Sequence, residues 1–201
     1  LEFKLMSMMQ YDVATMGNHD FDNGIDGFYA QLPHAKFDFV SANYDFKKTI
    51  LEGLVKPYKI LHKDGIKIGV FGLGIELEGL VDKKAYKETA YLDPIEIAQD
   101  MTKILKHKEK CDLVICLSHL GYKYREANKV SDEILARETE HIDVIIGGHT
   151  HTFLDRPTEE KNLDGETVLV NQVGWGGLEL GRLDFIVEKK RFNKTAGVVV
   201  Q

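Results

Sequence analysis

Three apolar segments of this chain each open with aspartate, and each runs into a loop that carries histidine. The segments are Asp12–His19, Asp112–His119 and Asp143–His151. Short apolar runs of this kind are typical of buried strands, and helical patterns stand between them along the chain. Because ligands of open α/β sheets bind beyond the carboxyl ends of the strands, we expect these histidines to converge at one edge of a sheet. The chain is therefore predicted to have an α/β fold with a histidine-rich edge.

The periodicity of the remaining sequence predicts one domain over residues 1–201, a layered α/β fold with mixed sheets. Helices are predicted at 1–9, 24–32, 93–108 and 129–140, and strands at 11–15, 37–43, 56–61, 66–73, 112–117, 143–146, 167–171 and 180–187. The first helix is expected to be amphipathic, with Leu1, Leu5, Met8 and Met9 at helical spacing. Residues 75–92 lack periodicity and are predicted to form a long surface excursion near the rim of the site.

The composition excludes several classes of protein. A hydrophobic fraction of 43% with 29% charged residues is ordinary for a soluble globular chain, and no apolar run is long enough to span a membrane. A net charge of -6 with scattered basic residues argues against nucleic acid as a partner. Cys111 and Cys116 would point to opposite faces of one strand, so a disulfide between them is not expected.

Four of the eight histidines share the strand-end context, and glycine stands beside three of them. These four are His19, His119, His149 and His151. One histidine at a strand end is usually structural, but four together with Asn18 favour a metal site. Imidazole and amide ligands suit Zn, Mn, Fe or Ni better than Ca or Mg. Because the ligands come from distant segments and include no thiolate, the pattern favours an open catalytic site over a structural zinc site.

Three motifs in this order resemble the calcineurin-like metallophosphatase domain, specifically its 5′-nucleotidase branch. They are Gly17-Asn-His-Asp-Phe-Asp-Asn-Gly24, Ser118-His-Leu-Gly121 and Gly148-His-Thr-His151. The resemblance covers essentially the whole chain. It implies a four-layer α/β/β/α sandwich with two divalent transition metals between its loops. It also implies a small phosphoester substrate, such as a nucleotide, and favours the periplasm or cell surface.

The resemblance also assigns roles to individual side chains. The metal ligands would be Asn18, His119 and His149 for the second metal, and His151 for the first. His19 would not be a ligand but would stabilise the transferred phosphoryl group, oriented by Asp22. Read from the residues alone, Asn18 could instead cap a turn, and Asp22 could cap the helix that starts near Gly24. Both alternatives stay open at this point.

Two of the family's motifs are absent from this sequence. No Asp is followed two residues later by His and none is preceded by Gly, so the family's Asp-x-His and its metal-bridging Gly-Asp have no counterpart. We expect these ligands, with the first strands of the sheet, upstream of Leu1 in a longer protein that also has a carboxy-terminal substrate domain. The chain alone would then bind at most one metal, weakly.

Two hypotheses about function follow from the sequence. The first is a metal-dependent phosphoester hydrolase, of which this chain is an impaired fragment. The second is a degenerate, non-enzymatic scaffold that docks to a partner. In that case a homodimer or a second chain would complete the sheet.

Overall fold

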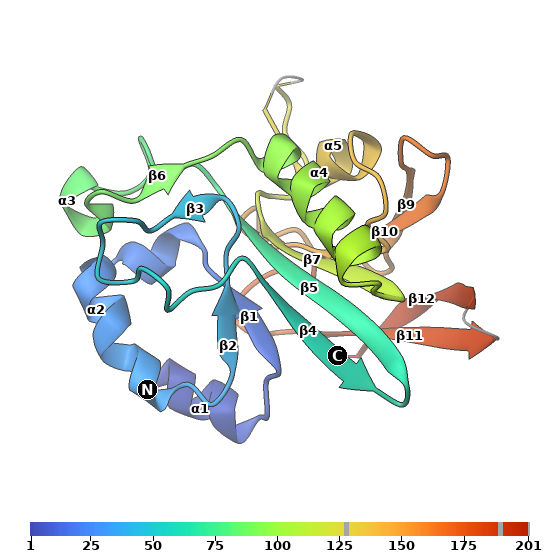
Figure 1. The fold of residues 1–201 in the computed structure, drawn as a ribbon, viewed down its shortest axis with the longest axis horizontal. Coiled ribbons are helices and arrows are strands. Elements are labelled where there is room, and N and C mark those ends of the chain that lie inside the picture. Colours follow the sequence, from blue (N-terminus) through green and yellow to red (C-terminus); the bar gives the residue numbers. More distant parts are fainter. Residues whose placement is uncertain (127–128, 189–190, 201) are drawn as a thin grey trace.

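The structure is a computed structural model that describes residues 1–126, 129–188 and 191–200 (Figure 1). Its largest element is a six-stranded sheet with the order β4-β5-β7-β8-β10-β9. The strands are β4 (Tyr58–Lys63), β5 (Ile66–Gly74), β7 (Leu113–His119), β8 (Val144–Ile146), β9 (Thr158–Lys161) and β10 (Thr167–Asn171). The four inner strands are parallel, and β4 and β9 are antiparallel at the edges. The predicted mixed α/β fold is confirmed.

Two helices cover one face of this sheet (Figure 1). They are α4 (Pro94–Lys103), which continues into the short η3 (Ile104–Lys108), and α5 (Asp132–Arg137). The side chain of Asp93 accepts hydrogen bonds from the backbone N–H groups of Ile95 and Glu96, and Pro94 occupies the first turn, so α4 begins where the sequence predicts. Both cysteines are free, but the predicted opposite-face arrangement is wrong: Cys111 precedes β7, and both side chains are buried in the same core beneath these helices.

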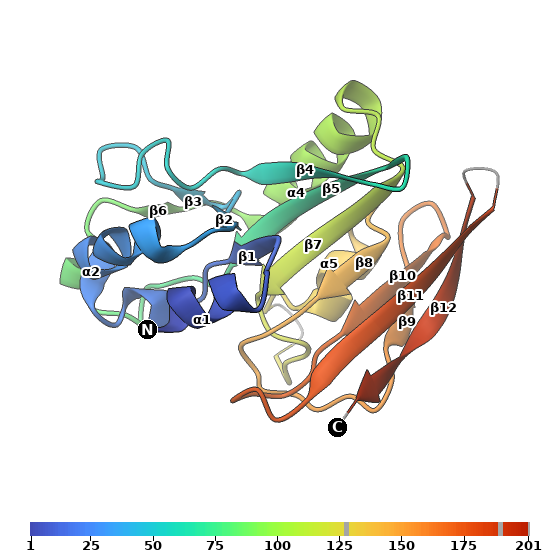
Figure 2. The same cartoon turned by 90° about the horizontal axis from the view of Figure 1, so that it is seen from below.

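The opposite face of the six-stranded sheet carries a second layer of strands in two pieces (Figure 2). One piece is the parallel pair β1 (Val13–Thr15) and β2 (Asp38–Val40), and the other is the antiparallel pair β11 (Leu180–Glu188) and β12 (Arg191–Val200). Helices α1 (Glu2–Met8) and α2 (Gly24–Gln31) cover β1 and β2 from outside, where Phe3 and Phe28 pack against Phe39. The layers thus follow the order α/β/β/α.

The two sheets approach most closely at Gly72 in β5. A Cβ atom at this position would lie 2.1 Å from the carbonyl oxygen of Val40 and 2.4 Å from Oγ1 of Thr15. The backbone N–H of Ala42 also donates a 2.7 Å hydrogen bond to the carbonyl of Gly72. Only glycine fits between the backbones here, and this contact fixes β1 and β2 above the carboxyl end of β5.

Between β1 and β11 the outer face of the large sheet is incompletely covered. On the inner face of β7, Val114 and Cys116 are fully buried, whereas Ile115 and Leu117 on its outer face are half-buried. These two side chains line an open groove of about 640 Å³, and Leu180 and Phe185 of β11 line its other side. A central strand in a four-layer fold is normally buried on both faces, so the second layer leaves an apolar gap.

Several local predictions differ from the structure. Helix α1 is present, but the side chains of Leu1, Leu5, Met8 and Met9 are exposed. Phe3 and Met6 make the inward contacts instead, so the prediction of an apolar face at those four positions is wrong. The predicted helix at 129–140 is shortened to α5, which begins after its N-cap Ser131 and ends at Arg137.

The predicted excursion at 75–92 contains regular structure. Its elements are the single-turn helix α3 (Lys83–Tyr86) and the two-residue strand β6 (Ala90–Tyr91), which pairs with β3 (Tyr44–Asp45). Strands β9 and β12 and the short helical turns η1 (Asn18–Phe21) and η2 (Leu32–His34) were also not predicted. Within the described ranges, no helix combines the length and apolar character needed to cross a membrane.

Candidate functional site

The amide oxygen of Asn18 joins the ends of two distant strands. Asn18 lies in η1, just after β1, and its Oδ1 lies 3.0 Å from Nε2 of His119 at the end of β7. The same oxygen lies 3.1 Å from Nδ1 of His149, which follows β8. The two imidazole rings meet edge to face, with centroids 5.2 Å apart. The carboxyl ends of β1, β7 and β8 therefore bring together the three side chains that the sequence predicts as ligands of the second metal.

Glycines make room for these rings. A Cβ atom at Gly17 would lie 2.6 Å from Cε1 of His119, and one at Gly148 would lie 3.0 Å from its Nδ1. Both His149 and His151 adopt the left-handed backbone conformation, with φ of 71° and 52°. Non-glycine residues rarely adopt this conformation, so the loop accepts strain to present its two imidazoles.

Electrostatics keep these imidazoles neutral. The pKa of His119 is lowered to about 4, chiefly by burial and then by the nearby His149, His19 and His151 in that order of effect. Burial also lowers the pKa of His149. A neutral imidazole offers a lone pair to a metal, whereas an imidazolium does not. At neutral pH both rings are thus in the form that binds a cation.

The buried carboxyl group of Asp132 bonds to the residue that precedes His119. Oδ1 of Asp132 accepts a 2.5 Å hydrogen bond from Oγ of Ser118, whose oxygen in turn accepts one from the backbone N–H of Leu120. Oδ2 of Asp132 is buried and has no hydrogen-bond partner among the described residues, and burial raises the pKa of this carboxyl to about 7. The Ser118 hydroxyl thus bonds both to Asp132 and to the backbone just after His119, and these two bonds fix the turn that carries His119.

Gln172 holds the loop that carries His149 and His151. This side chain is only 1% exposed. Its Nε2 donates to the carbonyl of Gly148 at 2.7 Å, and its Oε1 accepts from the backbone N–H of Thr152 at 2.5 Å. Neither Asp132 nor Gln172 was singled out from the sequence, because a single polar residue in an amphipathic helix or at a strand end carries no local signal of such a role.

His19 and Asp22 form the predicted pair. Nδ1 of His19 lies 3.0 Å from Oδ2 of Asp22, and the two side chains are 75% and 63% exposed. The cap of α2 shows no side-chain hydrogen bond, so Asp22 does not act as the helix cap that the sequence left open. Between the two lies Asp20, whose Oδ2 accepts from the backbone N–H of Gly17 at 2.7 Å. Burial raises the pKa of Asp20 to about 6.

His151, the fourth predicted ligand, contacts Trp175. Its ring stacks on Trp175, with centroids 5.8 Å apart and planes 20° apart. Sequence reasoning gave Trp175 no role, although its glycine-rich segment indicated an unusual loop. A group of His, Cys, Asp or Glu side chains can hold a metal when at least three ligand atoms lie within 4.8 Å of one another. Within the described part of the chain, the single group of this kind is Glu140, His141 and Asp164, which lies elsewhere.

The donor set at Asn18 fits a divalent transition metal. Ligand atoms about 2.1 Å from one ion lie roughly 3.0–3.4 Å apart in octahedral or tetrahedral geometry. The distances from Asn18 Oδ1 to the two ring nitrogens match this spacing. The first-metal position has fewer predicted ligands than the second. Among the described residues, His151 is the one predicted ligand assigned to it.

The chain matches known proteins over most of its length. Residues 1–153 match the family model described as calcineurin-like phosphoesterase. The chain is 33% identical to the trifunctional nucleotide phosphoesterase protein YfkN of Bacillus subtilis, over 94% of the chain and 14% of that protein. It is 34% identical to a 5′-nucleotidase of Vibrio cholerae, over 92% of the chain and 36% of the relative.

The fold agrees with these matches. The solved structure of a 5′-nucleotidase precursor from Thermus thermophilus superposes with a TM-score of 0.88 at 30% identity, over 99% of this chain and 40% of that one. The chain thus spans well under half the length of these relatives. The order of the site motifs, the layered fold and the matched length agree, and the chain belongs to the calcineurin-like phosphoesterase family.

Proposed function

We propose that this chain forms part of a metal-dependent phosphoester hydrolase site that acts on nucleotides or related phosphoesters. The observation that carries the proposal is the contact of one amide oxygen, Oδ1 of Asn18, with ring nitrogens of both His119 and His149. The names of the 5′-nucleotidase relatives support the substrate class. A periplasmic or cell-surface location is part of the proposal and can be checked by cell fractionation.

Each side chain has a chemical task in this proposal. Asn18, His119 and His149 would hold the second metal and His151 the first; when bound, such cations activate water and neutralise phosphoryl oxygens. His19 would donate a hydrogen bond from Nε2 to the phosphoryl group while its Nδ1–H donates to Asp22. The 3.0 Å contact between Nδ1 of His19 and Oδ2 of Asp22 would hold the ring in this orientation.

We further propose that the chain by itself is catalytically impaired. Its sequence contains no Asp-x-His and no Gly-Asp, so the proposed site lacks a carboxylate that could bridge two cations. Three neutral ligands at the second-metal position leave the positive charge of the ion uncompensated, which weakens binding. We expect one Mn²⁺ or Zn²⁺ per chain at this site, bound weakly, and slow turnover.

The experiment combines metal binding with turnover. Calorimetric titration of Mn²⁺ is compared between the wild type, His149→Asn and the control His34→Asn, whose imidazole is exposed and remote from the strand ends. Asparagine is chosen because it tolerates the positive φ of position 149. Release of phosphate from AMP is measured in parallel, for this chain and for the longer protein predicted above.

The proposal expects His149→Asn to weaken Mn²⁺ binding more than about tenfold, and expects metal-dependent turnover from the longer protein that His19→Ala reduces. Binding that His149→Asn leaves unchanged would contradict the metal site. Turnover without added metal, or turnover unaffected by both substitutions, would contradict the proposed hydrolase.

The alternative function is a docking scaffold, and the groove between β1 and β11 favours it. Among the described residues, β1 pairs only with β2 and β11 only with β12. Each strand therefore has one unpaired edge within the described ranges, and residues of β11 line the groove together with Ile115 and Leu117. Unpaired edges beside apolar surface favour strand addition, and we propose a second copy of this chain as the occupant. Light scattering that gives a dimer mass would support this alternative, and a stable monomer would count against it.

A further inference from the structure

A second cluster of metal-binding side chains lies at the other end of the large sheet. Glu140 and His141 precede β8, and Asp164 stands in the turn between β9 and β10. The candidate phosphoester site lies beyond the carboxyl end of β8, whereas this cluster lies before its amino end. We propose that Glu140, His141 and Asp164 form a separate binding site for a transition-metal cation, with Zn²⁺ as the best match.

The three side chains of the cluster lie close together. One ligand atom from each of the three residues lies within 4.8 Å of the other two. Oδ2 of Asp164 lies 3.7 Å from Nδ1 of His141, and Oε2 of Glu140 lies 4.0 Å from its Nε2. Tetrahedral ligands about 2.0 Å from zinc are roughly 3.3 Å apart. The two carboxylates lie beside different nitrogens of the His141 ring. Binding of one ion therefore requires the ring or one carboxylate to turn, so that a single ring nitrogen and both carboxylates face the ion.

A second imidazole stands next to the cluster. The ring of His107, in η3, meets the ring of His141 edge to face, with centroids 5.3 Å apart. Its side chain thus offers a further nitrogen beside two carboxylates and one imidazole. Two carboxylates balance the charge of a divalent cation, and imidazole selects transition metals over Ca²⁺ and Mg²⁺. This donor set differs from the neutral set at Asn18 in carrying its own compensating charge.

The backbone holds the two parts of the cluster together before any ion arrives. The N–H of Leu163 donates to the carbonyl of Thr139 at 3.2 Å, which ties the β9–β10 turn to the segment before His141. Within the turn, Oδ1 of the buried Asn162 accepts from the backbone N–H of Asp164 at 3.0 Å. Positions fixed in this way reduce the entropy cost of binding.

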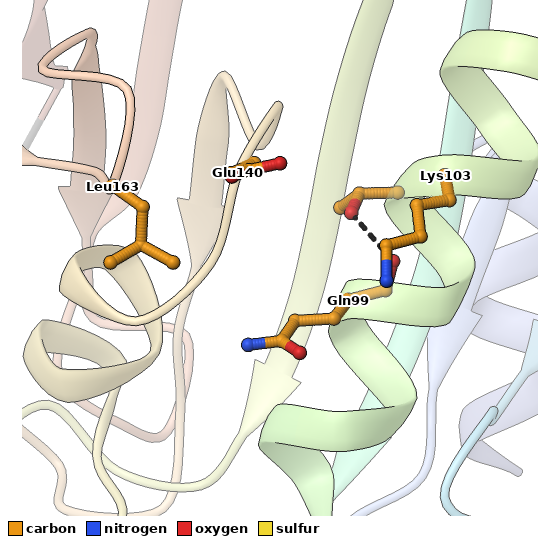
Figure 3. A pocket seen from close by; sticks show the side chains of 5 residues that line it. Gln99, Lys103, Glu140 and Leu163 are labelled. Carbon is orange, nitrogen blue, oxygen red and sulfur yellow. Dashed lines mark hydrogen bonds between the residues drawn. The ribbon is translucent and has the colours of Figure 1, made fainter.

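An open pocket adjoins the cluster on the Glu140 side. Its volume is about 150 Å³, and Glu140, Leu163 and residues of α4 line it. Figure 3 shows Gln99 and Lys103 on the α4 side and Glu140 on the facing loop. The carboxylates of Glu140 and Asp164 are 44% and 45% exposed. Both carboxylates are thus reachable from solvent, and Lys103 of α4 lines the pocket together with Glu140.

The test must separate this site from the histidines at Asn18. Zn²⁺ is therefore titrated calorimetrically into the His149→Asn variant, which lacks one imidazole of the phosphoester site, and into the same variant with His141→Asn or Asp164→Asn added. His62→Asn serves as the matched control, since His62 is an exposed histidine of β4. Asparagine at 141 accepts the φ of 65° found there. Near-ultraviolet circular dichroism checks that each variant is folded.

Side-chain nitrogen NMR of the histidines gives a local readout. We expect Zn²⁺ to shift the ring signals of His141 and His107 in the His149→Asn background. We also expect His141→Asn and Asp164→Asn each to lower the affinity more than about tenfold, while His62→Asn leaves it unchanged. Equal affinity with and without the His141 imidazole in folded variants, or Zn²⁺ shifts confined to His119 and His151, would overturn the proposal. Neither result depends on phosphoester turnover.

Discussion

Oδ1 of Asn18 lies 3.0 Å from Nε2 of His119, although 101 positions separate the two residues in the chain. If this oxygen is a metal ligand, Asn18→Ala should lower the affinity for Mn²⁺ more than about tenfold. Asn23→Ala is the matched control, because Asn23 is exposed and its side chain caps no helix. Calorimetric titration checks the prediction, and equal affinities in the two variants would count against a role for Asn18 in metal binding.

The lowered pKa values of the buried histidines predict that metal binding persists into acid. An ordinary imidazole has a pKa of about 6.5 and loses its lone pair below that pH. Burial brings the pKa of His119 to about 4 and lowers that of His149. Protons should therefore compete with Mn²⁺ at the Asn18 site only well below a pH of about 6.5. Mn²⁺ affinity is measured at a series of pH values from about 4.5 to about 7.5. An affinity that falls with a midpoint at about pH 6.5 would contradict the burial argument.

The buried carboxyl of Asp132 makes a prediction about stability. Burial raises its pKa from 3.8 to about 7, so the folded state binds a proton more tightly than the unfolded state between these values. This group therefore stabilises the fold at low pH, and the contribution is lost as the pH rises through about 7. Asp132→Asn removes the titration, and its stability relative to the wild type should rise by about 2–4 kcal/mol from about pH 4 to about pH 8.

Urea unfolding at both pH values measures the stability of wild type and Asp132→Asn. Glu138→Gln is a control with the same chemical change at an exposed position just after α5. A difference between Asp132→Asn and the wild type that stays constant with pH would contradict the assignment of a raised pKa to this group.

The contact at Gly72 predicts a strong difference between two substitutions in the same strand. In Gly72→Ala the new Cβ meets the backbone oxygen of Val40, which cannot move without shifting β2. In Gly69→Ala the nearest atoms are the side-chain ends of Leu105 and Cys111, and no backbone atom is among them. We expect a loss of about 2–3 kcal/mol for Gly72→Ala and less than about 1 kcal/mol for Gly69→Ala. Chemical denaturation of both variants checks this order, and equal losses would contradict it.

The sequence predicted the strands that lead to the site because each couples an apolar run to a histidine. β7 and β8 appear where those runs indicate, and the loops that follow them present His119, His149 and His151. The contacts of Asn18 with two rings could not be derived from spacing, since they depend on how β1 sits across β5. The family resemblance supplied that grouping, and the roles of these side chains remain predictions.

Other features escaped prediction for physical reasons. β9 consists of Thr, Glu, Glu and Lys, and such polar edge strands carry no apolar alternation. The predicted apolar face of α1 is wrong because Phe3 and Met6 face the core, whereas Leu5 and Met8 of the helix, like the flanking Leu1 and Met9, are exposed. Gln172 and Asp132 act through buried hydrogen bonds between distant segments, and no local pattern in one sequence reveals such partners.

The left-handed backbone at His149 and His151 has a consequence for how this loop can vary. Most side chains are strained at φ values of 71° and 52°, whereas asparagine, aspartate, histidine and glycine tolerate them best. Of these, glycine carries no donor atom. A saturation library at the two positions should therefore return a short list of folded variants, and metal preference could change only by exchange among imidazole, amide and carboxylate.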